Sequence, residues 1–263
     1  MALFSRKQRA EDAVSNAAEQ MAAAFEASQR GDYETALAIW GPLAHQGVGR
    51  AQNNVGACFS EGLGVERDLA LAIKWLTLSA EGGDAVGQRN LAAAYFKGEG
   101  VEENAVRAAE LYQLSATQGD AAAQDMLSWM LLEGEIIPPD YAESKRLAEA
   151  AASQGNVPSM TRLGMIYHNA LGVERSAQEA VRWWDKAAAR GDADAQAMLG
   201  AAYHLGAGVP RDPVSALMWL LRGQYGGSQL ATPFIDPVRA AMDDADKERA
   251  KKLAEMPLPE PVA

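Results

Sequence analysis

A fixed repeat of 36 residues runs through most of this chain and limits what it can fold into. The segment Glu61–Asp68, with the sequence EGLGVERD, recurs in four further copies with equal spacing and no insertion. A period of this size is typical of stacked helical repeats, in which each repeat buries its apolar face only against its neighbours. The sequence therefore predicts an all-α fold, an α/α solenoid of helix pairs. The copies of the segment begin at residues 61, 97, 133, 169 and 205.

Each repeat is expected to form two helices, because its apolar residues recur at helical spacing. The first helix carries an apolar or aromatic pair four residues apart, which places both side chains on one face. The pairs are Val55/Phe59, Leu91/Tyr95, Leu127/Leu131, Leu163/Tyr167 and Leu199/Tyr203. A small residue follows the first member of each pair and would allow another helix to approach closely. The second helix carries a large side chain at one equivalent position, which predicts a core ladder of Trp75, Leu111, Leu147, Trp183 and Trp219.

The turns contain residue types that end one helix and begin the next. Glycines such as Gly98 and Gly206 follow the first helix, where a residue with positive φ is often needed. The second helix is expected to start after a capping side chain, and Pro213 suits the first helical position after one of these caps. Turn chemistry and repeat period therefore support the same helices. The expected caps are Asp68, Asn104, Asp140, Ser176 and Asp212.

The repeat period divides the chain into five segments. A flexible leader is expected at 1–11, a TPR-like helix pair at 12–46, and five full repeats at 47–226. Beyond them, Pro233 and Pro237 are expected to interrupt a sixth first helix. A charged helix within 227–256 would cover the open end of the stack, and 257–263 is expected to be a disordered tail.

The repeated pattern resembles the Sel1-like repeat (SLR) family, a relative of the tetratricopeptide repeat (TPR). The pattern is A-x-x-x-L-G-x-x-Y, then G-x-G-V-x-x-D, then A-x-x-W-x-x-x-A-A-x-x-G. It stands most fully at Ala195–Tyr203, Gly206–Asp212 and, one repeat earlier, Ala180–Gly191. The resemblance implies a right-handed superhelix of stacked antiparallel helix pairs that serves as an adaptor or scaffold for protein complexes. Repeat 3 departs from the family pattern with Ile136 in place of the second loop glycine and two prolines after it.

Charge and cysteine content argue against several classes of protein. The net charge is −11, and no cluster of Lys and Arg provides the basic surface that nucleic-acid binding requires. The N-terminus lacks the apolar run of a signal peptide, and no stretch approaches the length of a transmembrane helix. Cys58 is the single cysteine and cannot form an intramolecular disulfide. The cytoplasm is therefore the expected location.

Catalytic and metal-binding patterns are missing from the sequence. No S-x-x-K, G-x-S-x-G or H-E-x-x-H motif occurs. His168 and His204 stand one period apart, but His45 is the only other histidine, and a zinc site needs three or four ligands. No catalytic residue, metal site or cofactor is expected.

One face of the first helices changes character in repeats 3 and 4. Where other repeats carry Ala57, Ala93 and Ala201, repeat 3 has Trp129 and repeat 4 has Met165. Trp, Met and Arg are enriched at the centres of protein interfaces. In TPR-like stacks this face lines the concave groove, which suggests a partner-binding patch there. The candidate residues are Phe96, Met126, Trp129, Leu132, Arg162, Met165 and His168. Alternatively, Trp129 packs between repeats beside the altered loop of repeat 3.

These observations favour a non-enzymatic scaffold or adaptor that binds a protein or peptide in its concave groove. Binding of nucleic acid and stable insertion into a membrane are not expected, and the oligomeric state is open. Two alternatives remain. One is a structural assembly module that joins other copies or proteins through its ends. The other is an enzyme or small-molecule binder, hydrolase-like in activity, that uses the same groove.

Overall fold

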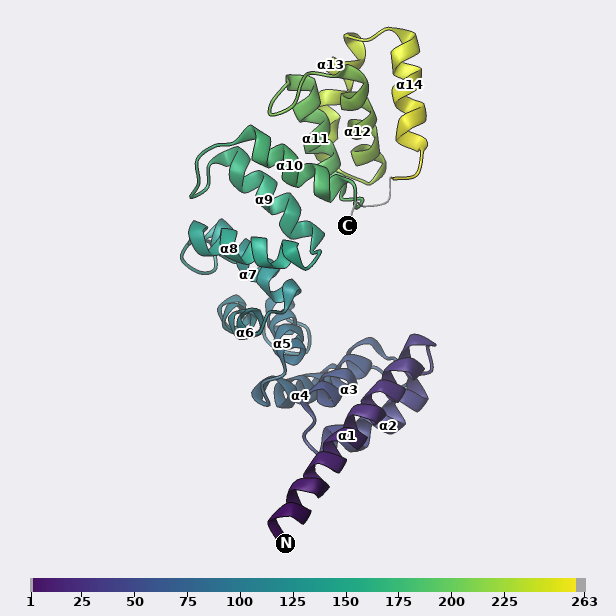
Figure 1. Ribbon diagram of the computed structural model, residues 1–263, viewed down its shortest axis with the longest axis vertical. Coiled ribbons are helices and arrows are strands. Elements are labelled where there is room, and N and C mark those ends of the chain that lie inside the picture. The colour runs from purple at the N-terminus through teal and green to yellow at the C-terminus, as the bar shows by residue number, and fades with distance from the viewer. Residues whose placement is uncertain (1, 259–263) are drawn as a thin grey trace. The chain divides into compact units, whose positions relative to one another are not determined.

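The computed structural model describes residues 2–258, with side chains from Asn16 onward. Every regular element in this range is helical, and consecutive helices pack against each other in pairs (Figure 1). The predicted all-α repeat fold is therefore confirmed. The chain divides into two compact units, Met1–Ala123 and Gln124–Ala263, called the first and second units here.

The first unit contains the N-terminal helix pair and the first two full repeats. Helix α1 begins at Ala2, so residues 2–11, expected to form a flexible leader, belong to the helix. The pairs are α1 (Ala2–Gln29) with α2 (Tyr33–His45), α3 (Gly49–Glu61) with α4 (Leu69–Glu81), and α5 (Ala85–Lys97) with α6 (Ala105–Thr117).

The second unit contains the remaining repeats and a C-terminal cap. Helix α7 (Ala121–Glu133) begins at the end of the first unit and continues into the second. It is followed by α8 (Tyr141–Ser153), α9 (Val157–Asn169), α10 (Ala177–Ala188), α11 (Ala193–Leu205) and α12 (Pro213–Tyr225). The cap consists of a 3₁₀ turn, Gln229–Ala231, then α13 (Thr232–Ala240) and α14 (Asp244–Glu255).

The predicted helix caps and turn glycines have the expected geometry. Asp68 Oδ1 accepts a hydrogen bond from the backbone N–H of Leu71 at 2.9 Å, and the other four predicted caps make equivalent bonds. Gly98 and Gly206 follow their helices with φ of 69° and 71°. In repeat 4 the same position is held by Ala170, whose φ is 58°. A left-handed conformation is strained for a residue with a Cβ atom, so repeat 4 carries a local cost that the other repeats avoid.

The predicted core ladder is correct in two repeats, whereas in the other three the buried large side chain is the next residue along the second helix. Leu111 and Leu147 are buried as expected, but Trp75, Trp183 and Trp219 are only half-buried. The next residue of each second helix is buried in all five repeats, and in repeats 1, 4 and 5 it lies against a glycine in the first helix of the same repeat. These residues are Leu76, Tyr112, Ala148, Trp184 and Leu220.

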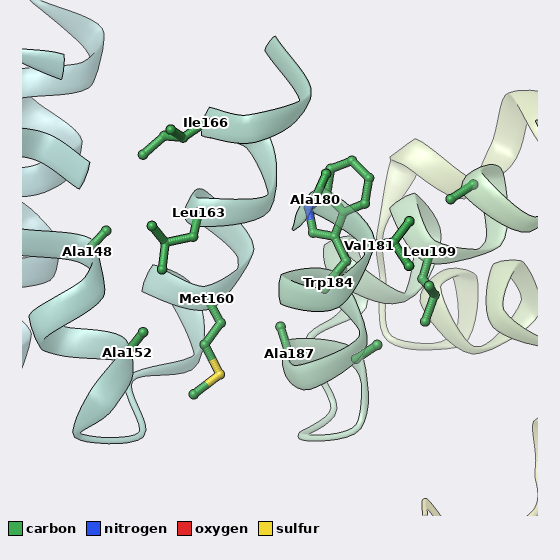
Figure 2. Packing of buried hydrophobic residues seen from close by; sticks show 13 residues of the cluster. Ala148, Ala152, Met160, Leu163, Ile166, Ala180, Val181, Trp184, Ala187 and Leu199 are labelled. Carbon is green, nitrogen blue, oxygen red and sulfur yellow. The ribbon is translucent and has the colours of Figure 1, made fainter. Parts of the chain in front are cut away.

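Close contact between the two helices of a repeat depends on the small residue predicted beside each apolar pair. A Cβ atom placed on Gly164 would overlap the indole of Trp184, and one placed on Gly200 would lie 2.7 Å from Leu220 Cγ. Figure 2 shows Trp184 in the buried cluster between α9 and α10, with Leu163 and Ile166 directed toward α8. The small residues therefore set the distance between paired helices.

Buried glutamines join successive repeats, a contact that the sequence patterns above do not predict. Gln88 Nε2 donates to the Ala80 carbonyl at 3.3 Å, and Gln196 Nε2 donates to the Ala188 carbonyl at 3.1 Å. Each bond pairs a carbonyl at the end of one helix with a side chain of the next helix. Such pairing matters because an unpaired carbonyl in the interior is costly.

The C-terminal cap differs from the predicted interruption. Pro233 lies in the first turn of α13, where its missing N–H is tolerated, and Pro237 lies inside the same helix. Ile235 and Val238 are buried against α12, and their burial favours the helix despite Pro237. Helix α14 packs on α12 and lies within 227–256, the range in which a covering helix was expected. The expected disordered tail, 257–263, lies outside the described residues except for its first two.

Candidate partner-binding site

The predicted patch does not lie within one unit. Phe96 is half-buried on α5 of the first unit, whereas the other six residues belong to α7 and α9 of the second unit. On α7, Met126, Trp129 and Leu132 are all half-buried, and Leu132 packs against the core of the unit. The second unit therefore brings six of the seven candidates onto two helices.

Arg162 on α9 forms an ion pair within the chain. Its Nη2 donates to Asp125 Oδ1 at 3.1 Å, and the side chains are only 14% and 12% exposed, respectively. Ser159 Oγ donates to the same carboxylate oxygen at 2.6 Å. The charge of Arg162 is thus balanced by a neighbouring repeat. This gives Arg162 a structural role that the patch prediction did not include.

Met165 and His168 extend the same face of α9. Met165 is 43% exposed. The His168 ring packs against Trp184, with the ring centroids 5.4 Å apart. His204, one repeat later, instead contacts Phe234 at a centroid distance of 6.3 Å. The two equivalent histidines therefore contact different aromatic rings.

A small apolar pocket opens beside His168. It has a volume of about 120 Å³ and is bounded by α9, α10, α11 and α13. For scale, an apolar cavity of about 150 Å³ admits benzene. The lining, called the second-unit pocket here, is His168, Ala177, Trp184, Met198, Ala201, Ala202, Leu205, Ala207 and Phe234.

Of the nine residues that line this pocket, His168 alone belongs to the predicted patch, and three of the other eight have large apolar side chains on α11 and α13. Met198 and Leu205 come from α11, and Phe234 comes from α13. The repeat pattern contained a signal for Leu205, because the equivalent residues of the other repeats are Glu61, Lys97, Glu133 and Asn169. Leu205 is 64% exposed, so an apolar side chain stands on the surface where the other repeats are polar. Phe234 lies beyond the repeats, so the period provides no signal for it.

The first unit has a cavity at the equivalent place, three repeats earlier. Its volume is about 190 Å³, and α3, α4 and α5 bound it. Ser60 replaces His168, Lys97 replaces Leu205, and Glu99 replaces Ala207. The repeat geometry thus forms the same recess twice, with polar residues around one and apolar residues around the other.

The described residues show few features of a reactive site. Cys58 is 2% exposed, and burial raises the pKa of its thiol to about 11, so it is not a thiolate at neutral pH. Among the residues whose side chains the structure describes, no group of three or more His, Cys, Asp or Glu is arranged to hold a metal ion. No described helix is long and apolar enough to cross a membrane.

Comparison with known proteins gives a consistent result along the chain. The sequence model of the Sel1 repeat matches residues 49–84, 85–120, 121–156, 157–192 and 193–223. This chain is similar to a Sel1 repeat protein from Oxalobacter formigenes, whose crystal structure is known. The two sequences are 26% identical, the alignment covers 92% of this chain and 99% of that protein, and the TM-score is 0.79.

A protective antigen of uropathogenic Escherichia coli strains, described as displaying an SLR fold, is 23% identical, with coverage of 89% and 67% and a TM-score of 0.47. A comparison with curated proteins finds no match.

Proposed function

We propose that this chain, which belongs to the Sel1 repeat family, is a non-enzymatic scaffold that binds a protein or peptide through its second unit. Sel1 repeats mediate protein interactions. The proposed binding surface combines the second-unit pocket with the neighbouring apolar residues of α7 and α9. These are Met126, Trp129, Leu132 and Met165.

The observation that carries this proposal is an exposed apolar side chain in the wall of an open recess, with a second one on a helix that bounds the recess. Met165 and Leu205 are 43% and 64% exposed, and Leu205 lines the pocket itself. Exposed apolar side chains gathered around a recess are a common feature of protein interaction sites. Methionine suits such a surface because its flexible thioether adapts to different partners.

The size of the recess supports a protein partner over a small molecule. Pockets that enclose drug-sized ligands usually have volumes of about 300–1,000 Å³. The second-unit pocket, at about 120 Å³, has room for one side chain. A partner would gain the rest of its contact area from the exposed residues outside the pocket.

A capture experiment with one charged substitution tests this function. The wild-type chain and Leu205→Glu are used to capture proteins from the native host, and bound proteins are identified by mass spectrometry. We expect a partner that binds the wild type and is lost with Leu205→Glu, because a carboxylate cannot be buried in an apolar contact without a large cost.

Leu114→Glu provides the matched control. Leu114 is 50% exposed on α6 of the first unit, so the chemical change is the same at a distant surface. The partner should remain bound to this variant. Equal capture by wild type and Leu205→Glu, or equal loss with both substitutions, would refute the proposed surface.

A further inference from the structure

The cavity of the first unit combines aliphatic walls with a charged rim. Leu69, Ile73 and Leu76 of α4 line it together with alanines of α3, α4 and α5. Leu76 is buried, whereas Leu69 and Ile73 are half-buried and in part accessible. The aliphatic wall matters because carboxylates alone would form only a solvated surface.

The rim carries more negative than positive charge. Glu61, Lys97 and Glu99 surround the opening, and all three are exposed. Lys97 Nζ lies 4.0 Å from Glu99 Oε1, with the side chains 60% and 49% exposed. A pair at this distance and exposure contributes little, so an incoming cation can replace Lys97 at Glu99.

Nearby cations are already engaged elsewhere in the first unit. Arg67 Nε donates to the Ser60 carbonyl at 2.8 Å. Arg50 and Arg89 pair with Asp84 and Asp120, each at 3.0 Å. Ser60 and Asn90 add neutral polar groups to the lining, and Asn90 Nδ2 donates to Asn53. The rim therefore presents two carboxylates and one weakly held ammonium group.

We propose that the first-unit cavity binds a Lys or Arg side chain of a partner polypeptide. Its methylene stem would lie along Leu69, Ile73 and Leu76, and its charged head would reach Glu61 and Glu99. Long basic side chains bind in this way, since the stem gains from burial while the head remains at the solvent edge. A cationic partner also suits a chain with a net charge of −11.

The equivalent pocket of the second unit gives the contrast that makes the assignment specific. There His168, Leu205 and Ala207 stand where the first unit has Ser60, Lys97 and Glu99. That pocket has no carboxylate in its lining, so it offers no partner for a buried cation. The basic-residue site of the first unit goes beyond the proposed function and does not depend on it.

Selection from a library of short random peptides tests the proposal. The full-length wild-type chain is the target, and selected peptides are sequenced and their affinities measured. We expect enrichment of Lys or Arg at one position. Replacing that residue by norleucine, which keeps an apolar stem without the charge, should weaken binding by about threefold to fivefold, the scale of an exposed ion pair.

A mutant cycle links the peptide's charge to the cavity. The Glu61→Gln/Glu99→Gln variant should bind the basic peptide about threefold to fivefold more weakly and should not discriminate it from the norleucine peptide. Glu102→Gln/Glu103→Gln, which removes two exposed carboxylates of the same unit outside the cavity, should retain both preferences. Circular dichroism confirms that each variant is folded.

Two results would overturn the cavity assignment. One is a selection without basic residues, including a selection that yields no binding peptide. The other is additive loss from norleucine and from the two glutamines, because independent effects mean that the groups do not meet. The scaffold proposal is tested by Leu205→Glu, which lies in the second unit, whereas the basic-residue site is tested by variants of the first unit. Failure of one proposal can therefore be told apart from failure of the other.

Discussion

Asp125 and Arg162 form a charge pair that joins the first helices of repeats 3 and 4. The paired atoms are 3.1 Å apart, and both side chains are mostly buried. In the first unit, Asn90 donates to Asn53 at 2.8 Å at the equivalent position of repeats 1 and 2. The same inter-repeat contact is thus made once by neutral amides and once by opposite charges.

Removing one member of this pair should be more harmful than removing both. Arg162→Ala leaves the carboxylate of Asp125 with Ser159 as its remaining partner among the described residues, and we expect a loss of about 3 kcal/mol in the free energy of unfolding. Asp125→Leu/Arg162→Met should lose less, because it leaves no uncompensated charge. Urea unfolding followed by circular dichroism gives the values. A loss in the double variant as large as that of Arg162→Ala would contradict the coupling.

Trp129→Ala distinguishes between two roles for Trp129, an anchor for the partner and a residue of the core. If Trp129 anchors the partner, the substitution should weaken binding by about 2 kcal/mol or more and cost little stability. Trp184→Ala is the matched control, because Trp184 is 2% exposed and its truncation should cost about 3–5 kcal/mol of stability. Thermal unfolding and partner binding are measured for both. A stability loss at Trp129 as large as that at Trp184 would show that it is core.

Ala170→Gly should stabilise the protein by about 0.5–1 kcal/mol, because glycine relieves the left-handed strain at φ 58°. In contrast, Gly98→Val and Gly206→Val should each destabilise it by about 1 kcal/mol or more. Ala189→Gly is the control, since Ala189 directly follows α10 with φ of −63° and gains nothing from glycine. Thermal unfolding compares all four. A lower melting temperature for Ala170→Gly would contradict the strain argument.

Ser215→Ala should have an effect on stability that depends on pH. The Ser215 hydroxyl donates to Asp212 Oδ2 at 2.6 Å and is the largest cause that lowers the pKa of Asp212 below 3.8. A lowered folded-state pKa means that ionised Asp212 stabilises the fold above the unfolded value and that this contribution is lost as the pH falls through the folded value.

The variant should therefore be less stable by about 1 kcal/mol at neutral pH and approach the wild type in acid. Urea unfolding at several pH values measures the difference. Thr35→Ala serves as a comparison at another helix start, because Thr35 also lowers the pKa of its capping residue, Asp32. A Ser215→Ala effect that is the same at every pH would contradict the linkage.

Features set by neighbouring residues were the most predictable from the sequence. The cap at Asp68 and the left-handed Gly98 depend on backbone groups within a few positions, so residue type and spacing were sufficient. Sequence spacing could not decide which of Trp183 and Trp184 is buried, because adjacent residues on a helix differ in direction by only a part of a turn. Gly164 decides the outcome, since its missing side chain admits Trp184.

The candidate site was less predictable because its groups come from different repeats. Arg162 was expected as a binding residue, but its acidic partner lies on another helix and was not identified from the period. Proline chemistry alone was also insufficient for α13, since Ile235 and Val238 gain burial from contact with α12. Both cases depend on tertiary contacts that a repeat alignment does not contain.

One wall of the second-unit pocket is Phe234, which lies on α13 beyond the last matched repeat residue, 223. The five repeats share one sequence pattern, so a substitution that reshapes the pocket within a repeat departs from that pattern. The cap segment occurs once, so a substitution in it departs from no repeat pattern. Exchange of this single segment between related chains would therefore be an economical way to diversify partner choice while leaving the repeats unaltered.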